Sequence, residues 1–499
     1  MSEGRAGGWV TAVGFAALAA VAAASIVLGG ARTVQAAAPA APAAPVALAG
    51  EGVAWVYWTA PEAGITGYTI QATPGGATVG VSGSSLSVDF TGLTDGTAYS
   101  FTVSASNGVT GPPSPPSAAV VPGLGAYHPL TPARILDTRS TSRLAAAATR
   151  DVAVAGQGGV PSSGATAAVL NVTATGTTAA GYLAVWPAGT PRPATSNLNW
   201  SAGKTVANLV EVAIGSGGAV SVFNALGGAD VVIDVEGYVE TPVASPPAAG
   251  LYNPLVPSRV LDTRIGLGSG QAQLCAGQTI TVTIAGHGGV PASGVSAVVL
   301  NVTATKTVVA PSAWTVYPAG ASRPLASNLN FVPGQTVANR VIVALGTGGA
   351  VSWYNLFGHA DVVADVSGWF TDGTGATTGS RFVGIPPARL LDTRTGAALG
   401  HGVPLVLAVA GHGGVPATGA TVPATAVVLN VTVTNPTAAS YLTVWPAGSA
   451  MPGTSDLNYV AGLTVANLVV VKLGTAGSID LFSAAGTTDV VVDVVGWYG

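Results

Sequence analysis

Short apolar runs separated by turn residues make up most of the chain after residue 126. The runs are five to nine residues long, and Gly, Pro, Ser and Asn lie between them. No ten-residue stretch places apolar residues at the 3.6-residue period of a helix between capping residues. The pattern therefore predicts several strands per domain, packed as a β-sandwich or jelly roll. In the first copy of the pattern the expected strands are Ala167–Thr175, Tyr182–Trp186, Val206–Ile214, Ala219–Asn224 and Asp230–Tyr238.

Several motifs recur three times in the same order. The first, Arg-x-Leu-Asp-Thr-Arg, begins at residues 134, 259 and 389, so the copies are 125 and 130 residues apart. This period exceeds the roughly 20–50 residues of a solenoid or propeller repeat and is typical of a whole domain. The other motifs are Ala-Gly-x-Gly-Gly-Val-Pro from 155, 285 and 410, Leu-Asn-Val-Thr from 170, 300 and 429, Thr-Val-Ala-Asn from 205, 336 and 464, and Asp-Val-Val-x-Asp-Val-x-Gly from 230, 361 and 489.

We therefore expect three tandem homologous domains, at residues 126–240, 251–371 and 381–499. Their shared motifs resemble a family of Leu-Asp-Thr-Arg repeat modules that are appended to secreted actinobacterial proteins. The resemblance covers residues 126–499. It implies an extracellular location and a modular protein, and it implies no activity for the module.

A different domain is expected at residues 39–122, where short alternating strands are separated by Gly, Pro and Asp. This stretch resembles a fibronectin type III domain over about 80 residues, through Trp58 with Pro61, Tyr68, Leu93 to Tyr99, and Asn107 with Gly108. The resemblance implies that Trp58 fills the core between two sheets. It also implies that Tyr99 forms a tyrosine-corner hydrogen bond beside Leu93.

Residues 1–38 are expected to be a signal peptide or signal anchor. Arg5 precedes an apolar run from Trp9 to Gly30, and Val34-Gln35-Ala36 supplies a small-x-small cleavage pattern. The run is long enough to span a bilayer, so an uncleaved anchor is the alternative. The expected fold class is therefore all-β: a fibronectin type III sandwich and three β-sandwich or jelly-roll repeats after an apolar signal helix.

The charge balance excludes some partners. Charged residues make up only 8% of the chain, the net charge is −4, and no basic run occurs. We therefore expect no nucleic-acid partner, and a membrane contact only through the N-terminal segment if it is uncleaved. Cys275 is the only cysteine, which excludes an intrachain disulfide and a cysteine zinc cluster. We expect neither a cofactor nor a metal.

The few charged residues are concentrated in two of the motifs, where Arg–carboxylate pairs tying the first strand of each repeat to its last would explain them. Strand alternation places Asp137 and Arg139 on one face and Arg134 on the other. A calcium site is the alternative, but two carboxylates fall short of the ligands it needs. A glycosidase pair would need an open cleft between the carboxylates. The expected pairing residues are Arg134, Asp137, Arg139, Asp230 and Asp234, then Arg259, Asp262, Arg264, Asp361 and Asp365, and then Arg389, Asp392, Arg394, Asp489 and Asp493.

No catalytic residue is predicted. His287 and His412 stand in Gly-His-Gly-Gly-Val-Pro, which is similar to the oxyanion loop of esterases. No Gly-x-Ser-x-Gly nucleophile motif accompanies them, so tight glycine turns are the better interpretation.

Aromatic residues are the candidate binding surface. Tyr182 and Trp186 lie on one face of their expected strand, and aromatic rings of this kind stack on sugars. The alternative is that the rings pack against the second sheet or a neighbouring repeat. The candidate residues are Tyr182, Trp186, Trp200, Tyr317, Phe331, Tyr441, Trp445 and Tyr459.

The sequence thus predicts a secreted or cell-surface, non-catalytic modular protein that binds cell-wall or extracellular polysaccharide. One alternative is an accessory or glycoside hydrolase-related component of extracellular polysaccharide degradation. The other is a structural spacer or adhesin that binds proteins.

Overall fold

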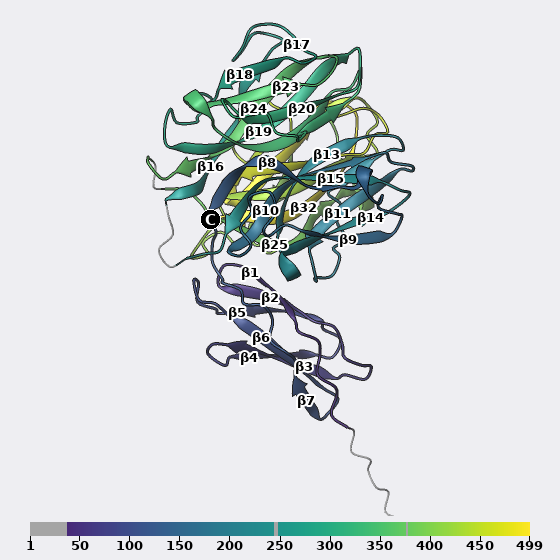
Figure 1. Cartoon of the computed structure of the whole chain (residues 1–499), viewed down its shortest axis with the longest axis vertical. Helices are drawn as coiled ribbons and strands as arrows, with labels where there is room; N and C mark the ends of the chain where they lie inside the picture. The colour runs from purple at the N-terminus through teal and green to yellow at the C-terminus, as the bar shows by residue number, and fades with distance from the viewer. Residues whose placement is uncertain (1–36, 244–247, 376–377) are drawn as a thin grey trace, which may run out of the picture. The chain divides into compact units, whose positions relative to one another are not determined.

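The computed structural model describes residues 37–243, 248–375 and 378–499 (Figure 1). The chain divides into residues 1–37 and 38–499, and the expected signal segment lies outside the described residues except for its last two. None of the helices in the described part has the length and hydropathy needed to cross a membrane. The expectation of an all-β fold is confirmed, because the helical segments described are short 3-10 turns. They are η1 (Thr138–Ser140), η2 (Ser216–Gly218), η3 (Thr347–Gly349), η4 (Thr393–Thr395) and η5 (Thr475–Gly477).

The first domain is a two-sheet sandwich with strand orders β1-β2-β5 and β4-β3-β6-β7. Trp58 is only 6% exposed in the core between the sheets, and the backbone N–H of Thr94 donates to the Tyr99 hydroxyl at 3.2 Å. Both contacts agree with the tyrosine-corner layout. The strands are β1 (Val46–Ala49), β2 (Val53–Tyr57), β3 (Gly67–Thr73), β4 (Thr78–Ser82), β5 (Ser87–Thr91), β6 (Ser100–Ser106) and β7 (Thr110–Pro113).

Each repeat is also a sandwich of two antiparallel sheets, here called the inner and the outer sheet. In the first repeat the inner sheet has the order β13-β10-β15-β8 and the outer sheet β12-β11-β14-β9 (Figure 1). The strands are β8 (Tyr127–Asp137), β9 (Ala148–Ala153), β10 (Ala165–Thr175), β11 (Gly181–Pro187), β12 (Leu198–Trp200), β13 (Val206–Ala213), β14 (Ala219–Asn224) and β15 (Asp230–Glu240).

The second and third repeats have the same strand order, and the second adds β17 beside β24. The second repeat contains β16 (Ala249–Asp262), β17 (Leu274–Cys275), β18 (Thr279–Thr283), β19 (Val295–Val308), β20 (Ser312–Pro318), β21 (Leu329–Phe331), β22 (Val337–Ala344), β23 (Ala350–Asn355) and β24 (His359–Asp372). The third contains β25 (Phe382–Asp392), β26 (Leu405–Ala408), β27 (Ala426–Thr434), β28 (Ser440–Pro446), β29 (Leu457–Tyr459), β30 (Val465–Lys472), β31 (Ser478–Ser483) and β32 (Asp489–Tyr498).

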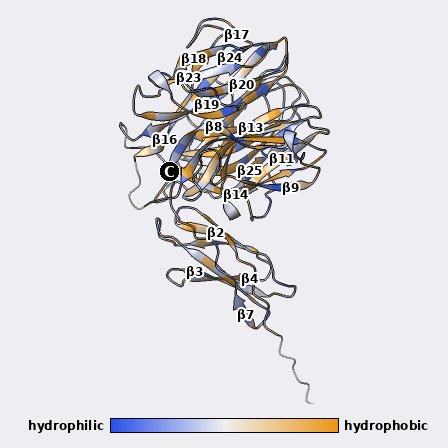
Figure 2. Cartoon of the chain, viewed as in Figure 1, coloured by the Kyte–Doolittle hydropathy of each residue, from blue (hydrophilic) through white to orange (hydrophobic). Residues whose placement is uncertain are grey.

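Both faces of each inner sheet are buried. Along β10, Ala168 and Leu170 point into the sandwich core of the first repeat, whereas Ala167 and Val169 belong to a core shared by all three repeats. A strand buried on both faces is expected to be an almost continuous apolar run, and this explains the valine-rich sequences (Figure 2). The three inner sheets thus face one another, and their strands β13, β22 and β30 are in mutual contact.

Aromatic rings fill part of this shared core. The Tyr252 ring packs at a tilt against Phe370 and Tyr498, with ring centroids 5.1 and 4.3 Å away. Glycines make room for the rings, because a Cβ at Gly237 would collide with the ring of Tyr127. The last glycine of the Asp-Val-Val-x-Asp-Val-x-Gly motif therefore leaves room for an aromatic ring of its own repeat, and that ring belongs to the shared core. The same collision would occur between Gly368 and Tyr252 and between Gly496 and Phe382.

Asparagine side chains join the repeats in a cyclic order. Asn171 of the first repeat donates through Nδ2 to the backbone oxygen of Ser327 in the second, at 2.5 Å. The equivalent bonds lead from the second repeat to the third, Asn301 to Ser455, and from the third back to the first, Asn430 to Ser196. Because the third contact returns to the first repeat, three head-to-tail interfaces close into a ring.

A second asparagine in each repeat reinforces the ring. Asn339 of the second repeat donates to the Asn171 side-chain oxygen at 2.9 Å and accepts the backbone N–H of Leu209 at 3.1 Å. All of these groups are buried, so the bonds satisfy donors and acceptors that water cannot reach. The equivalent groups are Asn467 with Asn301 and Arg340, and Asn208 with Asn430 and Leu468.

The shared core also holds ionisable groups that differ between the repeats. Tyr498 donates to Glu211 Oε1 at 3.1 Å, and Asn328 donates to Glu236 Oε1 at 2.5 Å. Burial raises the pKa of Glu211 and of Glu236 from 4.5 to about 8. Arg340 is also buried and donates to Asp456 at 2.6 Å.

We predict that Asn339→Ala lowers the free energy of unfolding by about 3 kcal/mol, because buried partners in two repeats lose their hydrogen bonds. Chemical denaturation measures the change. Asn199→Ala is the matched control, since among the described residues the Asn199 side-chain amide bonds only to Ser196 in its own loop. Equal losses for the two variants would contradict the role given to Asn339.

We also predict that stability decreases as pH rises from about 4.5 to about 8. In this range the folded state keeps protons on Glu211 and Glu236 that the unfolded chain releases, so each group costs about 1.4 kcal/mol per pH unit. The double variant Glu211→Gln/Glu236→Gln should remove this slope in denaturation experiments at several pH values. Parallel pH profiles of variant and wild type would show that the two carboxyls do not titrate in this way.

Candidate functional site

The arginines of the Arg-x-Leu-Asp-Thr-Arg motif pair with aspartates of the last strand and of the motif itself. Arg134 donates through Nε to Asp234 Oδ1 at 2.8 Å and through Nη2 to Asp234 Oδ2 at 3.1 Å. Arg139 pairs with Asp137, with Nη2 2.5 Å from Oδ2. The second and third repeats form the same pairs: Arg259 with Asp365 and Asp262, Arg264 with Asp262, Arg389 with Asp493 and Asp392, and Arg394 with Asp392.

A β-bulge decides which groups meet. The register between β8 and β15 shifts between the pairs Leu136/Ile233 and Arg134/Asp234. Simple alternation places Arg134 and Asp137 on opposite faces, whereas Arg134 Nη1 lies 3.4 Å from Asp137 Oδ2. The extra residue in β8 turns the Arg134 side chain to the side of Asp137. Strand alternation alone could not reveal this.

The first aspartate of the last strand has other partners. Asp230 pairs with Arg143 at 2.7 Å and accepts from the Thr138 hydroxyl at 3.4 Å, so it stands apart from Arg134 and Arg139. Arg143 lies outside the shared motifs, and nothing in the sequence pattern pointed to it. The equivalent aspartates have other partners. Asp361 accepts a hydrogen bond from Thr263 and forms an ion pair with Lys306. Asp489 accepts hydrogen bonds from Thr393 and Asn435.

The pairs set the charge state of the motif. The hydrogen bond from Arg139 lowers the pKa of Asp137 to about 2. Burial raises the pKa of Asp234, and the bonds from Arg134 oppose that rise. Of the described residues, no three His, Cys, Asp or Glu side chains are grouped closely enough to hold a metal ion.

The aromatic candidates are mostly enclosed. The Trp186 ring is 4% exposed, and its indole N–H donates to the backbone oxygen of Thr190, in the loop that follows β11. That loop folds back over the face that strand alternation left free. Tyr441 is 38% exposed and Tyr182 is partly exposed. The other exposed fractions are 5% for Trp200, 8% for Tyr317, 3% for Phe331, 2% for Trp445 and 4% for Tyr459.

The glycine turn beside the motif is structural in all three repeats. Gly158 has a φ of 56°, and a Cβ there would collide with Val235 of the last strand. A Cβ at Gly288, the residue after His287, would lie 2.6 Å from the Val260 side chain. The Gly-His-Gly-Gly segment therefore packs a tight turn onto the inner sheet.

A groove of about 370 Å³ with both polar and apolar lining residues lies between the first and second repeats. On the side of the first repeat it is lined by Arg134, Arg139, Thr173, Thr175 and Thr205. The side of the second repeat includes the loop Arg323 to Ser327, together with Asn330, Tyr354 and Leu356. Sequence reasoning missed this groove because its two sides come from different repeats.

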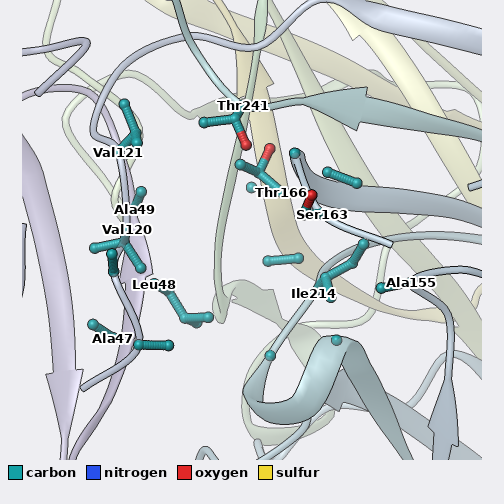
Figure 3. Close-up of a pocket in the computed structure, with 18 of the residues that line it drawn as sticks. Ala47, Leu48, Ala49, Val120, Val121, Ala155, Ser163, Thr166, Ile214 and Thr241 are labelled. Carbon is teal, nitrogen blue, oxygen red and sulfur yellow. The ribbon is translucent and has the colours of Figure 1, made fainter. Parts of the chain in front are cut away.

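A larger cavity, about 480 Å³, is lined by the fibronectin-like domain, the first repeat and residues 382–384 of the third repeat (Figure 3). Leu48 and Val120 face Ile214 and Thr166 across it. Its lining is mainly aliphatic side chains, glycines and hydroxyls, with no ionisable side chain among the described lining residues. This composition offers space but no group for acid–base chemistry.

Comparisons with known proteins identify one part of the chain. The search of curated protein sequences found no match to this chain. Among solved structures, "Crystal structure of chicken CNTN1 FN1-FN3 domains" is 14% identical, covers 68% of this chain and 95% of that chain, and has a TM-score of 0.16. "The Triple Jelly Roll Fold and Turret Assembly in an Archaeal Virus" is 8% identical, with 75% and 90% covered and a TM-score of 0.15.

Whole-chain similarity at these TM-scores does not establish a shared fold. A family model, in contrast, matches residues 45–120, and its description is "Fibronectin type III domain". The match coincides with the sandwich of β1 to β7 and its Tyr99 hydrogen bond. Residues 45–120 are a fibronectin type III domain in a modular, all-β chain.

Proposed function

We propose that the chain is a non-catalytic extracellular protein in which three repeats form one rigid body linked to a fibronectin type III domain. The observation that carries the proposal is the closed ring of asparagine hydrogen bonds between the repeats. Domains that are merely strung together keep relative motion, whereas a large, apolar shared core suppresses it. A rigid body of this kind suits a structural spacer or a platform that presents surfaces to partners.

The paired carboxylates support a non-catalytic role. Asp234, Asp365 and Asp493 are buried, and each accepts two hydrogen bonds from one arginine. A glycosidase needs two carboxyl groups on either side of a sugar in an open cleft. In an accessory component of polysaccharide degradation these aspartates would have a structural role, because they tie the first strand of each repeat to its last.

Polysaccharide binding is the second candidate function, and Tyr441 is the observation that favours it. Its ring, near the start of the internal strand β28 of the outer sheet, is 38% exposed, and the equivalent Tyr182 is partly exposed. Exposed tyrosines provide a flat apolar face with a polar edge, which suits sugar rings. In this proposal the cell wall or an extracellular polysaccharide is the partner.

We predict that residues 126–499 unfold in a single step when the chain is stretched from its two ends in an optical trap. Full extension of that segment releases about 130 nm of chain, whereas each repeat alone would release about 40 nm. The fibronectin type III domain should give a separate step of about 30 nm. Three independent steps of about 40 nm would contradict a single rigid body.

We predict that the chain is retained by insoluble peptidoglycan, chitin or cellulose, and that Tyr441→Ala weakens retention severalfold through loss of a stacking surface. Co-sedimentation measures it. Tyr459→Phe is the control, because that ring is buried and keeps its packing. If no polymer retains the wild-type chain, binding to these polymers is excluded.

A further inference from the structure

The groove between the first and second repeats has the features of a binding site. Thr173 is only 5% exposed, lines the groove, and its hydroxyl has no hydrogen-bond partner among the described residues. A buried hydroxyl without a partner costs free energy, and Thr303 at the equivalent position of the second repeat is in the same state. A ligand in the groove that reaches Thr173 would complete its hydrogen bond. Thr175 and Thr205 lie beside it, with their hydroxyls 2.7 Å apart.

The groove also carries one positive charge that the protein does not neutralise. Arg134 and Arg139 are paired with Asp234 and Asp137. Arg323 has no ion pair among the described residues, and its guanidinium carbon lies 3.7 Å from the centre of the Tyr354 ring. Stacking on an aromatic ring holds the guanidinium in place while its N–H groups remain available.

We propose that this groove binds a carboxylate-bearing sugar unit of an acidic polysaccharide. Arg323 provides the planar pair of donors that matches a carboxylate. Thr173, Thr175 and Asn330 provide hydroxyl and amide groups for the hydroxyls of the sugar ring. The ligand lies across two repeats, so the site exists only where the first and second repeats pack together. This inference rests on the second candidate function, polysaccharide binding.

The chain contains its own comparison sites. Arg192 occupies the position of Arg323 in the first repeat and lies 3.7 Å from the centre of the Phe223 ring. In the third repeat the same loop position is Met451, which is 47% exposed. The loop takes a similar place there, since Arg259 of the second repeat donates to the backbone oxygen of Gly453. The fold therefore accepts methionine at this position, and Arg323→Met should fold normally.

The test measures binding of the intact chain to soluble polygalacturonate, a carboxylated polymer, with dextran and dextran sulfate as neutral and sulfated references. We expect binding to polygalacturonate, at least tenfold weaker binding by Arg323→Met, and no binding to dextran. Thr173→Val should weaken binding severalfold without loss of stability, because it replaces an unpartnered buried hydroxyl by a methyl group. A purely structural role for Thr173 would leave binding unchanged.

Other outcomes would overturn the proposal in distinguishable ways. If Arg323→Met lost binding to dextran sulfate and to polygalacturonate equally, the groove would bind anionic polymers in general and would not be specific for a carboxylate. Polygalacturonate binding that Arg323→Met leaves unchanged would place the acidic-sugar site elsewhere. Retention on a neutral polymer through Tyr441 without polygalacturonate binding would remove the groove assignment and keep the polysaccharide function. Absence of binding to every polymer would remove both.

Discussion

Asparagine amides that reach from one repeat to the backbone of the next are the contacts on which the rest of this structure depends. Each inner sheet has a buried edge strand, and a buried strand must find partners for its backbone and polar side chains. Asn339 supplies both, because it donates to Asn171 and accepts the N–H of Leu209. A repeat separated from its neighbours would expose an apolar face, and its asparagine amides would lose their hydrogen-bond partners beside that apolar surface. The three repeats therefore stabilise one another as a ring.

The ring is not chemically symmetric, and the differences lie at its centre. One position of the last strand is Glu236 in the first repeat, Ser367 in the second and Val495 in the third. Glu236 meets Asn328, whereas Ser367 accepts a hydrogen bond from Arg340, which also pairs with Asp456. Each interface thus has its own polar contact, and exchange of two repeats would leave a buried charge without its partner. This arrangement favours one order of repeats around the ring.

Much of the fold could be predicted from the sequence, because apolar alternation and turn residues specify strands locally. The roles of Trp58 and Tyr99 were implied by the resemblance of about 80 residues to a fibronectin type III domain, and the structure shows both. Contacts between segments that are far apart in the sequence were harder to predict. The β-bulge beside Asp234 changes the face of Arg134, and no local pattern encodes it.

The candidate site shows the same limit. Alternation along the strand of Trp186 predicted that one face is exposed, but a loop from the same repeat covers that face. Asn171 binds a neighbouring repeat and Thr173 lines a groove that two repeats share, and their motif by itself shows neither contact. One sequence lacks the information about which surfaces meet, because tandem copies carry identical motifs on both sides of each contact.

Native-state hydrogen exchange of three equivalent backbone amides tests the closed ring most directly. The N–H groups of Leu209, Arg340 and Leu468 each donate to an asparagine of another repeat. If the ring is closed, all three exchange only through unfolding of the whole three-repeat body. Asn467→Ala, placed in the third repeat, then lowers the protection of all three amides by the same free energy. Loss of protection at Arg340 alone, the amide bonded to Asn467, would show that the repeats are stable independently and would contradict the account.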